Sequence, residues 1–236
     1  MRLIILFLFC AGQLAAFGRD TWQSALSRMP LNVPMRQLTR TNCVQIMLDS
    51  FHSNNVVKGI VFMPGATDEF YMFHRAKATL TNAAPTLLDA VIALTNQTFI
   101  RATFRPPLLL LHTVEDPTDP LVVIRHLPTG YQLEGKHFVR HADYYDKDWD
   151  YLLPILKKSL SLSFSPRLYS MDSWHFYRHS FAGWNLNGWE TLQAVALAGK
   201  TKFTINRKSV AFEGDERIMA PVPALDQLSP VQPLHK

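Results

Sequence analysis

The sequence predicts an α+β fold made of two tandem βαββαββ modules, each with two helices packed against small mixed sheets. Three observations lead to this prediction. Residues 180–214 have the pattern of a strand, a helix and a hairpin. Residues 69–112 repeat that order of elements. A strand, a helix and a further strand are expected ahead of each of these two stretches.

The helix in residues 180–214 is expected to start after Asn187. The short Asn187 side chain can accept a hydrogen bond from the first helical turn, and Glu190 completes a capping box. We expect Gly199 to end the helix as its C′ residue. Residues 202–206 and 209–212 then alternate polar and apolar side chains, which predicts a hairpin. One apolar face of the helix is formed by Trp189, Leu192, Val195 and Ala196.

Identical residues in the first repeat and in residues 180–214 are separated by the same number of positions along the sequence. We expect a helix over 86–94, with Leu88 buried at the position equivalent to Leu192, followed by strands over 99–104 and 108–112. Five identities at one offset can arise by chance, so the shared order of elements is the stronger argument for a duplication. The five pairs are Ala78 and Ala182, Leu88 and Leu192, Ala90 and Ala194, Val91 and Val195, and Phe99 and Phe203.

Residues 1–18 have the pattern of a secretory signal peptide. Arg2 precedes an apolar run over 3–11, which is too short to span a bilayer because spanning needs about 20 residues. We expect cleavage near Gly18 and an exported protein, periplasmic or extracellular, with no stable membrane insertion afterwards. Cleavage leaves Cys43 as a single cysteine, so no internal disulfide is expected and Cys43 is expected to be a small buried residue.

The remaining segments set the expected domain boundaries. The first module covers 30–114, and the second covers 133–214. Between them, a turn-rich linker over 115–132 includes an added strand near 121–127. The proline-containing tail over 215–236 is expected to be extended. The other expected elements are strands over 33–38, 56–62, 69–73, 137–141, 160–164 and 174–177, and helices over 42–51 and 149–160.

This arrangement resembles the secretin and TonB short N-terminal domain family. Residues 150–166 match its first half, a helix followed by a strand with a Phe-x-Pro step. Residues 180–212 match its second half, with Gly183 and the 192–195 helix segment at the expected places. The resemblance covers residues 145–213 well and residues 36–112 more loosely. It implies a compact periplasmic module that docks onto another protein, without catalytic residues or a cofactor.

Two histidine pairs raise the question of a metal site. His137 and His141 share a four-residue spacing, as do His175 and His179. Helical pairs at this spacing can hold one ion, but strand pairs lie about 13 Å apart, at ~3.3 Å per residue. Because both segments are typical of strands, we expect no metal ligands here. The acidic cluster over 143–150 is expected to precede and cap the following helix rather than to act in acid–base catalysis.

No nucleophile elbow, phosphate-binding glycine loop or zinc-protease motif occurs, so we expect no enzyme and no cofactor. The net charge of +5 is spread along the chain without a basic stripe, which argues against nucleic-acid binding. Exposed aromatic residues remain as candidates for partner binding. The candidates are Trp184, Tyr177 and Trp174.

These patterns favour an exported, non-catalytic protein-interaction module that docks onto an envelope partner of a secretion or TonB-type system. The alternative hypothesis is a glycan- or peptidoglycan-binding module that uses the tryptophan-rich second module. Four of the five tryptophans lie in that module, and an exposed tryptophan can stack on a sugar ring or anchor a protein partner.

Overall fold

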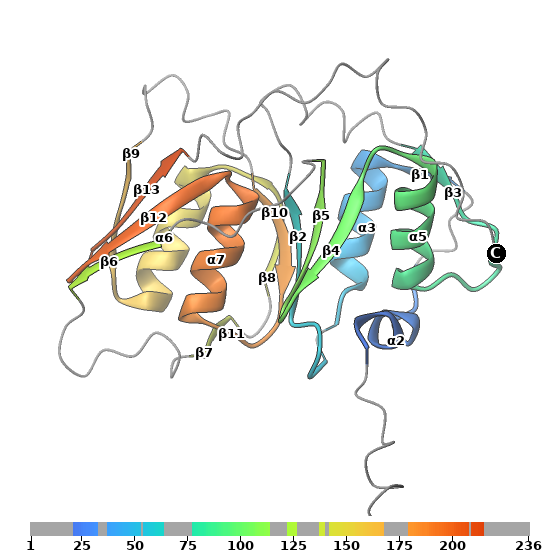
Figure 1. Ribbon diagram of the computed structural model, residues 1–236, viewed down its shortest axis with the longest axis horizontal. Coiled ribbons are helices and arrows are strands. Elements are labelled where there is room, and N and C mark those ends of the chain that lie inside the picture. Colours follow the sequence, from blue (N-terminus) through green and yellow to red (C-terminus); the bar gives the residue numbers. More distant parts are fainter. Residues whose placement is uncertain are drawn as a thin grey trace, which may run out of the picture.

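The structure, a computed structural model, describes residues 21–32, 37–52, 54–63, 77–113, 122–126, 137–139, 142–167, 179–207 and 209–214. The fold is α+β, as the sequence predicts (Figure 1). The expected signal peptide, the expected tail and the strands expected over 69–73 and 174–177 lie outside the described residues. The helices are α2 (Trp22–Ser27), α3 (Arg40–Ser50), α5 (Leu87–Gln97), α6 (Trp149–Leu160) and α7 (Gly188–Ala198).

The strands form two larger sheets and two pairs. The central sheet has the order β4-β5-β2-β10-β8, the outer sheet has the order β6-β12-β13-β9, and the pairs are β1-β3 and β11-β7. The strands are β1 (Gln37–Thr39), β2 (Gly59–Met63), β3 (Lys77–Thr79), β4 (Arg101–Arg105), β5 (Leu108–His112), β6 (Val122–His126), β7 (His137–Val139), β8 (Ala142–Lys147), β9 (Ser163–Arg167), β10 (His179–Gly183), β11 (Leu186–Asn187), β12 (Thr201–Asn206) and β13 (Ser209–Gly214).

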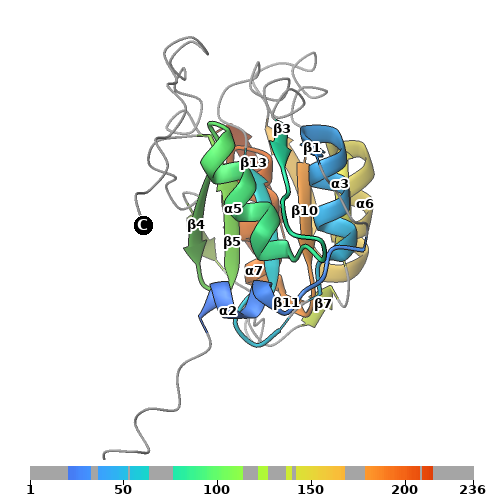
Figure 2. The ribbon, with the colours of Figure 1, turned by 90° about the vertical axis from the view of Figure 1, so that its right-hand side faces the viewer.

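The elements stack in layers along the long axis of the molecule (Figure 1). The β1-β3 pair contacts α3 and α5, which cover one face of the central sheet. Helices α6 and α7 lie between the other face of that sheet and the outer sheet. Figure 2, which views the molecule from the α5 end, shows α3 and α5 side by side in front of the central strands.

The two halves of the chain share a local topology. In the first half, the antiparallel hairpin β4–β5 is extended by β2, which runs parallel to β5. In the second half, the antiparallel hairpin β12–β13 is extended by β9, which runs parallel to β13. The antiparallel pair β1–β3 likewise corresponds to the antiparallel pair β8–β10.

The central sheet joins the halves, because β10 pairs with β2 in antiparallel register. Ser180 lies opposite Phe62, and Gly183 lies opposite Gly59. A Cβ atom on Gly59 would lie 3.0 Å from the carbonyl oxygen of Ala182, so the close approach of these strands favours glycine there. The sheet is therefore continuous across the two halves.

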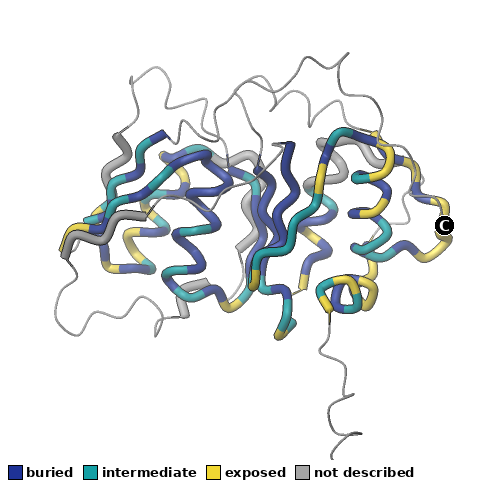
Figure 3. Tube along the Cα trace, in the orientation of Figure 1, coloured by how far each residue is buried: buried dark blue, intermediate teal, exposed yellow. Residues whose placement is uncertain are grey.

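Two hydrophobic cores lie on opposite faces of this sheet. Side chains alternate between the faces along each strand, as the pleat requires. Figure 3 shows the central strands as the most continuously buried part of the molecule. The core on the α5 side includes Ile60, Phe62, Leu109, Leu111 and Ala182. The core on the α7 side includes Val61, Met63, Leu108, Leu110 and Phe181.

The capping boxes confirm the predicted helix starts and correct the alignment of the halves. The Asn187 side chain accepts from the Glu190 backbone, and Thr86 with Asp89 makes the same box at the start of α5. If these boxes are equivalent, then Val91, and not Leu88, corresponds to Leu192. Leu88 is only half-buried, whereas Leu192 is fully buried, so the expectation of equal burial is wrong.

Gly199 does not end α7 in the expected way. Its φ angle is −88°, and the following residue, Lys200, adopts the left-handed conformation with φ of 55°. A Cβ atom on Gly199 would overlap Nε2 of His179, which is fully buried in β10. The glycine is therefore favoured by the tight packing of α7 against β10 rather than by left-handed geometry.

Candidate interaction site

The sequence-predicted binding residues are only partly described. Trp174 and Tyr177 lie outside the described residues, and Trp184 lies just after β10 and is half-buried. The Trp184 amide donates to the Lys58 carbonyl at 2.8 Å. Asn185, which follows, has a φ of 52° and begins the turn into β11. Trp184 is thus held at the junction of the two halves.

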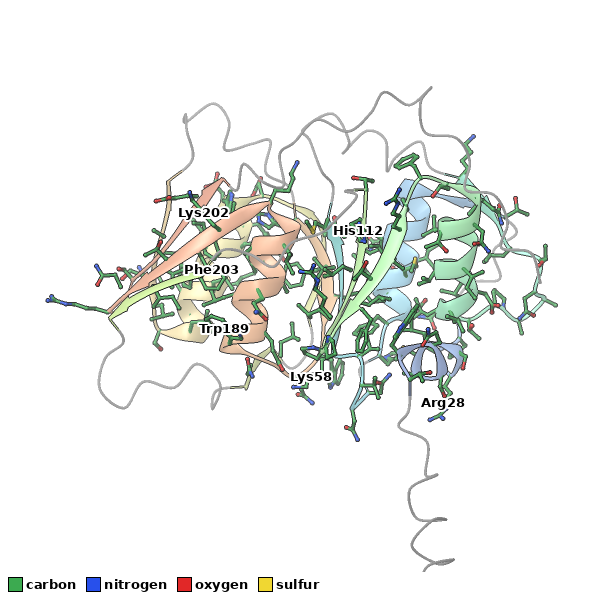
Figure 4. All side chains as sticks on the ribbon, in the orientation of Figure 1. Arg28, Lys58, His112, Trp189, Lys202 and Phe203 are labelled. Atoms are coloured by element: carbon green, nitrogen blue, oxygen red, sulfur yellow. The ribbon has the colours of Figure 1, made fainter. Side chains whose placement is uncertain are left out.

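Lys58 connects three parts of this junction (Figure 4). Its amide donates to the Pro107 carbonyl at 2.9 Å, and its carbonyl accepts from Trp184. Its ammonium lies 2.8 Å from Glu190 Oε1. The other oxygen of Glu190 accepts from the Asn187 amide at 2.8 Å. One carboxylate thus caps α7 and pairs with Lys58 of the first half, an arrangement that stabilises the junction.

The other described tryptophans of the second half pack against its core. Trp149 is fully buried, with its ring 4.4 Å from the ring of His179 in an edge-on contact. Trp189 is half-buried and lies edge-on to Phe203, with ring centroids 5.7 Å apart (Figure 4). Trp149 cannot reach a sugar ring from this position, which removes one residue from the tryptophan-rich surface that the alternative hypothesis needs.

The histidines do not gather in the described part of the chain. His112 is buried in β5, where its Nε2 lies 2.8 Å from Thr103 Oγ1, and His179 is buried in β10. His137 lies in β7, while His141 and His175 fall outside the described residues. No group of three or more histidine, cysteine, aspartate or glutamate residues with metal-binding geometry occurs among the described residues.

The acidic cluster ahead of α6 has the predicted capping role where it is described. Asp148 is the N-cap residue, and its side chain accepts from the Tyr151 amide at 3.0 Å. Asp150 lies in the first turn, where a negative charge interacts favourably with the helix dipole. Asp148 and Asp150 therefore have a structural explanation.

Strand β4 offers an edge of the central sheet. In the described part of the chain it pairs with β5 alone. Arg101 is exposed, and the four residues after it are half-buried. Phe104 contacts Trp22 of α2, with ring centroids 6.3 Å apart. An extended backbone edge therefore lies beside a half-exposed aromatic pair.

Sequence reasoning missed this combination for a specific reason. Trp22 was given no role, because residues 19–29 fall between the expected signal peptide and the expected first module. The cap Thr21, whose side chain accepts from the Ser24 amide at 3.2 Å, is the signal that could have revealed α2.

Comparison with protein-family models, with curated proteins and with solved structures finds no match for this chain. The resemblance to the secretin and TonB short N-terminal domain family therefore stays a prediction from the sequence. None of the helices in the described part of the chain has the length and apolar character needed to cross a membrane.

Proposed function

We propose that this protein is an exported, non-catalytic interaction module that binds an extended segment of a partner protein along β4. The export signal expected in residues 1–18 supports a location in the cell envelope or outside the cell. The main support for the binding mode is the position of β4 at the edge of the central sheet, where β5 is its one strand neighbour among the described residues.

The side chains of β4 indicate the chemistry of that partner segment. Ala102 and Phe104 pack toward the core on the α5 side. The alternation of the strand puts Arg101, Thr103 and Arg105 on the opposite face, with the arginines about 13 Å apart at ~3.3 Å per residue. A partner strand with acidic residues at alternate positions would place carboxylates beside both guanidinium groups.

The same arginines disfavour pairing between two copies of β4. An antiparallel pair centred on Thr103 would place Arg101 of one copy opposite Arg105 of the other. Like charges directly opposite each other destabilise such a pair. Basic residues on an edge strand protect it from self-association, and they also select an acidic partner.

Binding of two synthetic peptides tests this proposal. One peptide alternates glutamate with valine, and the other alternates lysine with valine. We expect the acidic peptide to bind about tenfold more tightly, because each favourable cross-strand charge pair contributes roughly 0.2–1 kcal/mol. Hydrogen exchange should show added protection of the β4 amides when the acidic peptide is bound.

Charge-reversal variants provide the matched control. Arg101→Glu combined with Arg105→Glu should reverse the preference between the peptides. Lys157→Glu combined with Lys158→Glu makes the same charge change on an exposed part of α6 and should leave the preference unchanged. Equal affinity for both peptides, or protection that avoids β4, would contradict the proposed docking edge.

A further inference from the structure

Helix α5 carries an apolar flank beside the edge strand β4. Ile92 is 45% exposed, and Leu88, four residues earlier, is half-buried. Residues at this spacing lie on the same side of an α-helix, so Leu88 and Ile92 define the α5 flank. Among the described residues, Ile92 and Tyr151 are the two large hydrophobic side chains that are exposed. The exposure of Ile92 is therefore a distinctive feature of the surface next to β4.

The opposite side of α5 is occupied by β3. Gln97 Oε1 accepts from the Thr79 amide at 2.8 Å, and Gln97 Nε2 donates to the Thr79 carbonyl at 2.9 Å. In a helix with 3.6 residues per turn, Leu88 and Ile92 lie about 180° and about 140° around the axis from Gln97. Figure 2 shows β3 and β4 on opposite sides of α5. The α5 flank is therefore on the side of the helix that is nearer the β4 edge.

The dimensions of a helix and a sheet place the α5 flank over the position of a further strand. Helix α5 packs on β4. A helix with its side chains has a radius of about 5–6 Å, and a strand added to β4 would lie about 4.8 Å beyond it. The side chains of that strand on the face of Ala102 and Phe104 would therefore meet the α5 flank.

Trp22 and Phe104 add to the apolar surface near the end of β4. Their ring centroids are 6.3 Å apart, and both residues are half-buried against the core on the α5 side. The Leu87 amide donates to the Met29 carbonyl at 2.8 Å, which attaches the start of α5 to the segment after α2. The surface on the α5 side of the β4 edge thus has apolar side chains from α2, α5 and β4.

The two faces of an added strand would meet different chemistry. On the α7 side of the sheet, the strand would lie beside Arg101 and Arg105. On the α5 side, it would lie beside Leu88 and Ile92. Thr95, which shares the α5 flank, already donates its hydroxyl to the Ile92 carbonyl at 3.1 Å. Acidic residues therefore complement one face, and apolar residues complement the other.

We propose that the partner segment is an amphipathic strand whose bulky apolar residues, placed between its acidic residues, pack against the α5 flank. This inference rests on the proposed docking along β4. Alternate residues of a strand lie about 6.6 Å apart, and Leu88 and Ile92 lie about 6 Å apart along the helix axis. Two successive apolar positions of the partner can therefore each contact one of these side chains.

Two peptides of equal charge test the inference on the full chain. One alternates glutamate with valine, and the other alternates glutamate with threonine, which has nearly the shape of valine and also favours strands. We expect the valine peptide to bind about tenfold more tightly, because a hydroxyl in place of a methyl group loses apolar burial at each position. Nuclear Overhauser effects should connect the valine methyl groups to those of Leu88 and Ile92.

Ile92→Ala is the matched change in the protein. It removes most of the exposed side chain and keeps a strong helix former at that position. We expect it to weaken binding of the valine peptide by about fivefold and to leave the affinity of the threonine peptide unchanged, which is the signature of direct coupling. Tyr151→Ala removes the other exposed large side chain, on α6, and should leave both affinities unchanged. Circular dichroism checks that each variant is folded.

The possible failures are distinguishable. Equal affinities of the valine and threonine peptides, with the β4 amides still protected on binding, would overturn this inference and keep the docking edge. Equal affinities of the glutamate–valine and lysine–valine peptides would contradict the docking edge and this inference with it. A dimer of the unmodified chain that Ile92→Ala dissociates, measured by sedimentation, would assign the α5 flank to a second copy and would also overturn the inference.

Discussion

Helices α5 and α7 begin with the same capping box and lead into the same kind of hairpin, yet they are buried to very different extents. Nearly every residue of α7 is buried, including the polar Thr191. On α5, Ile92 is 45% exposed and Leu88 is half-buried. The difference follows from the layers, because α7 lies between the central and outer sheets (Figures 1 and 3). Beyond the central sheet and α3, the described elements that contact α5 are the small β1-β3 pair and the short helix α2. The local sequence thus determines where each helix begins. The layer in which the helix lies determines how much of it is buried and how much it contributes to stability.

The largest effect is expected when the two halves are separated. Fragments 19–118 and 131–218 should each fail to fold cooperatively, because the first loses the β10 partner of β2 and the second loses the sheet that covers one face of α7. Circular dichroism during thermal unfolding measures this directly. Mixing the fragments should restore a cooperative transition. Two separately soluble fragments with sharp transitions would show that the halves have independent cores.

A smaller difference is expected between two leucine truncations. Leu192→Ala removes a fully buried side chain and should cost about 2–5 kcal/mol of unfolding free energy. Leu88→Ala removes a half-buried one and should cost about 1 kcal/mol. Denaturant unfolding of both variants compares them, with Ile92→Ala as an exposed control. Equal losses of unfolding free energy for the two variants would support the alignment that pairs Leu88 with Leu192, and would contradict the alignment that pairs Val91 with Leu192.

The smallest change in unfolding free energy is expected when the N-cap side chains of α5 and α7 are removed. Thr86→Ala and Asn187→Ala each remove an N-cap side chain and should each cost about 1 kcal/mol. The costs should be similar because each cap acts within its own first turn. Thr95→Ala, inside α5, is a control that should change the unfolding free energy by less than about 0.5 kcal/mol. A much larger cost at Asn187 would mean that the Glu190–Lys58 contact depends on that cap.

The sequence predicted the parts of the fold that depend on neighbours along the chain. The caps at Asn187 and ahead of α6, the hairpin β12–β13 and the strand in the linker all follow from local patterns, and the structure confirms them. The pairing of β10 with β2 could not be predicted in this way. Both strands are apolar and suited to a buried sheet, so their composition alone does not identify the partner of either strand.

The candidate site residues were also only partly predictable from local sequence patterns. Among the tryptophans of the second half, Trp184 was expected to be partly exposed and most of the others to be in the core; Trp184 is half-buried and Trp149 is fully buried. Helix α2, which places Trp22 beside Phe104 of β4, was not predicted.

Native-state hydrogen exchange tests most directly whether one continuous sheet unites the two halves. The amides of β2 and β10 that bond to each other should exchange only through global unfolding, with the same free energy of opening as the amides of β5. Leu192→Ala should then lower that free energy equally in β2, β5 and β10. Early exchange in β10 together with α7, while β2 and β5 stay protected, would show that the second half opens independently and would contradict the shared sheet.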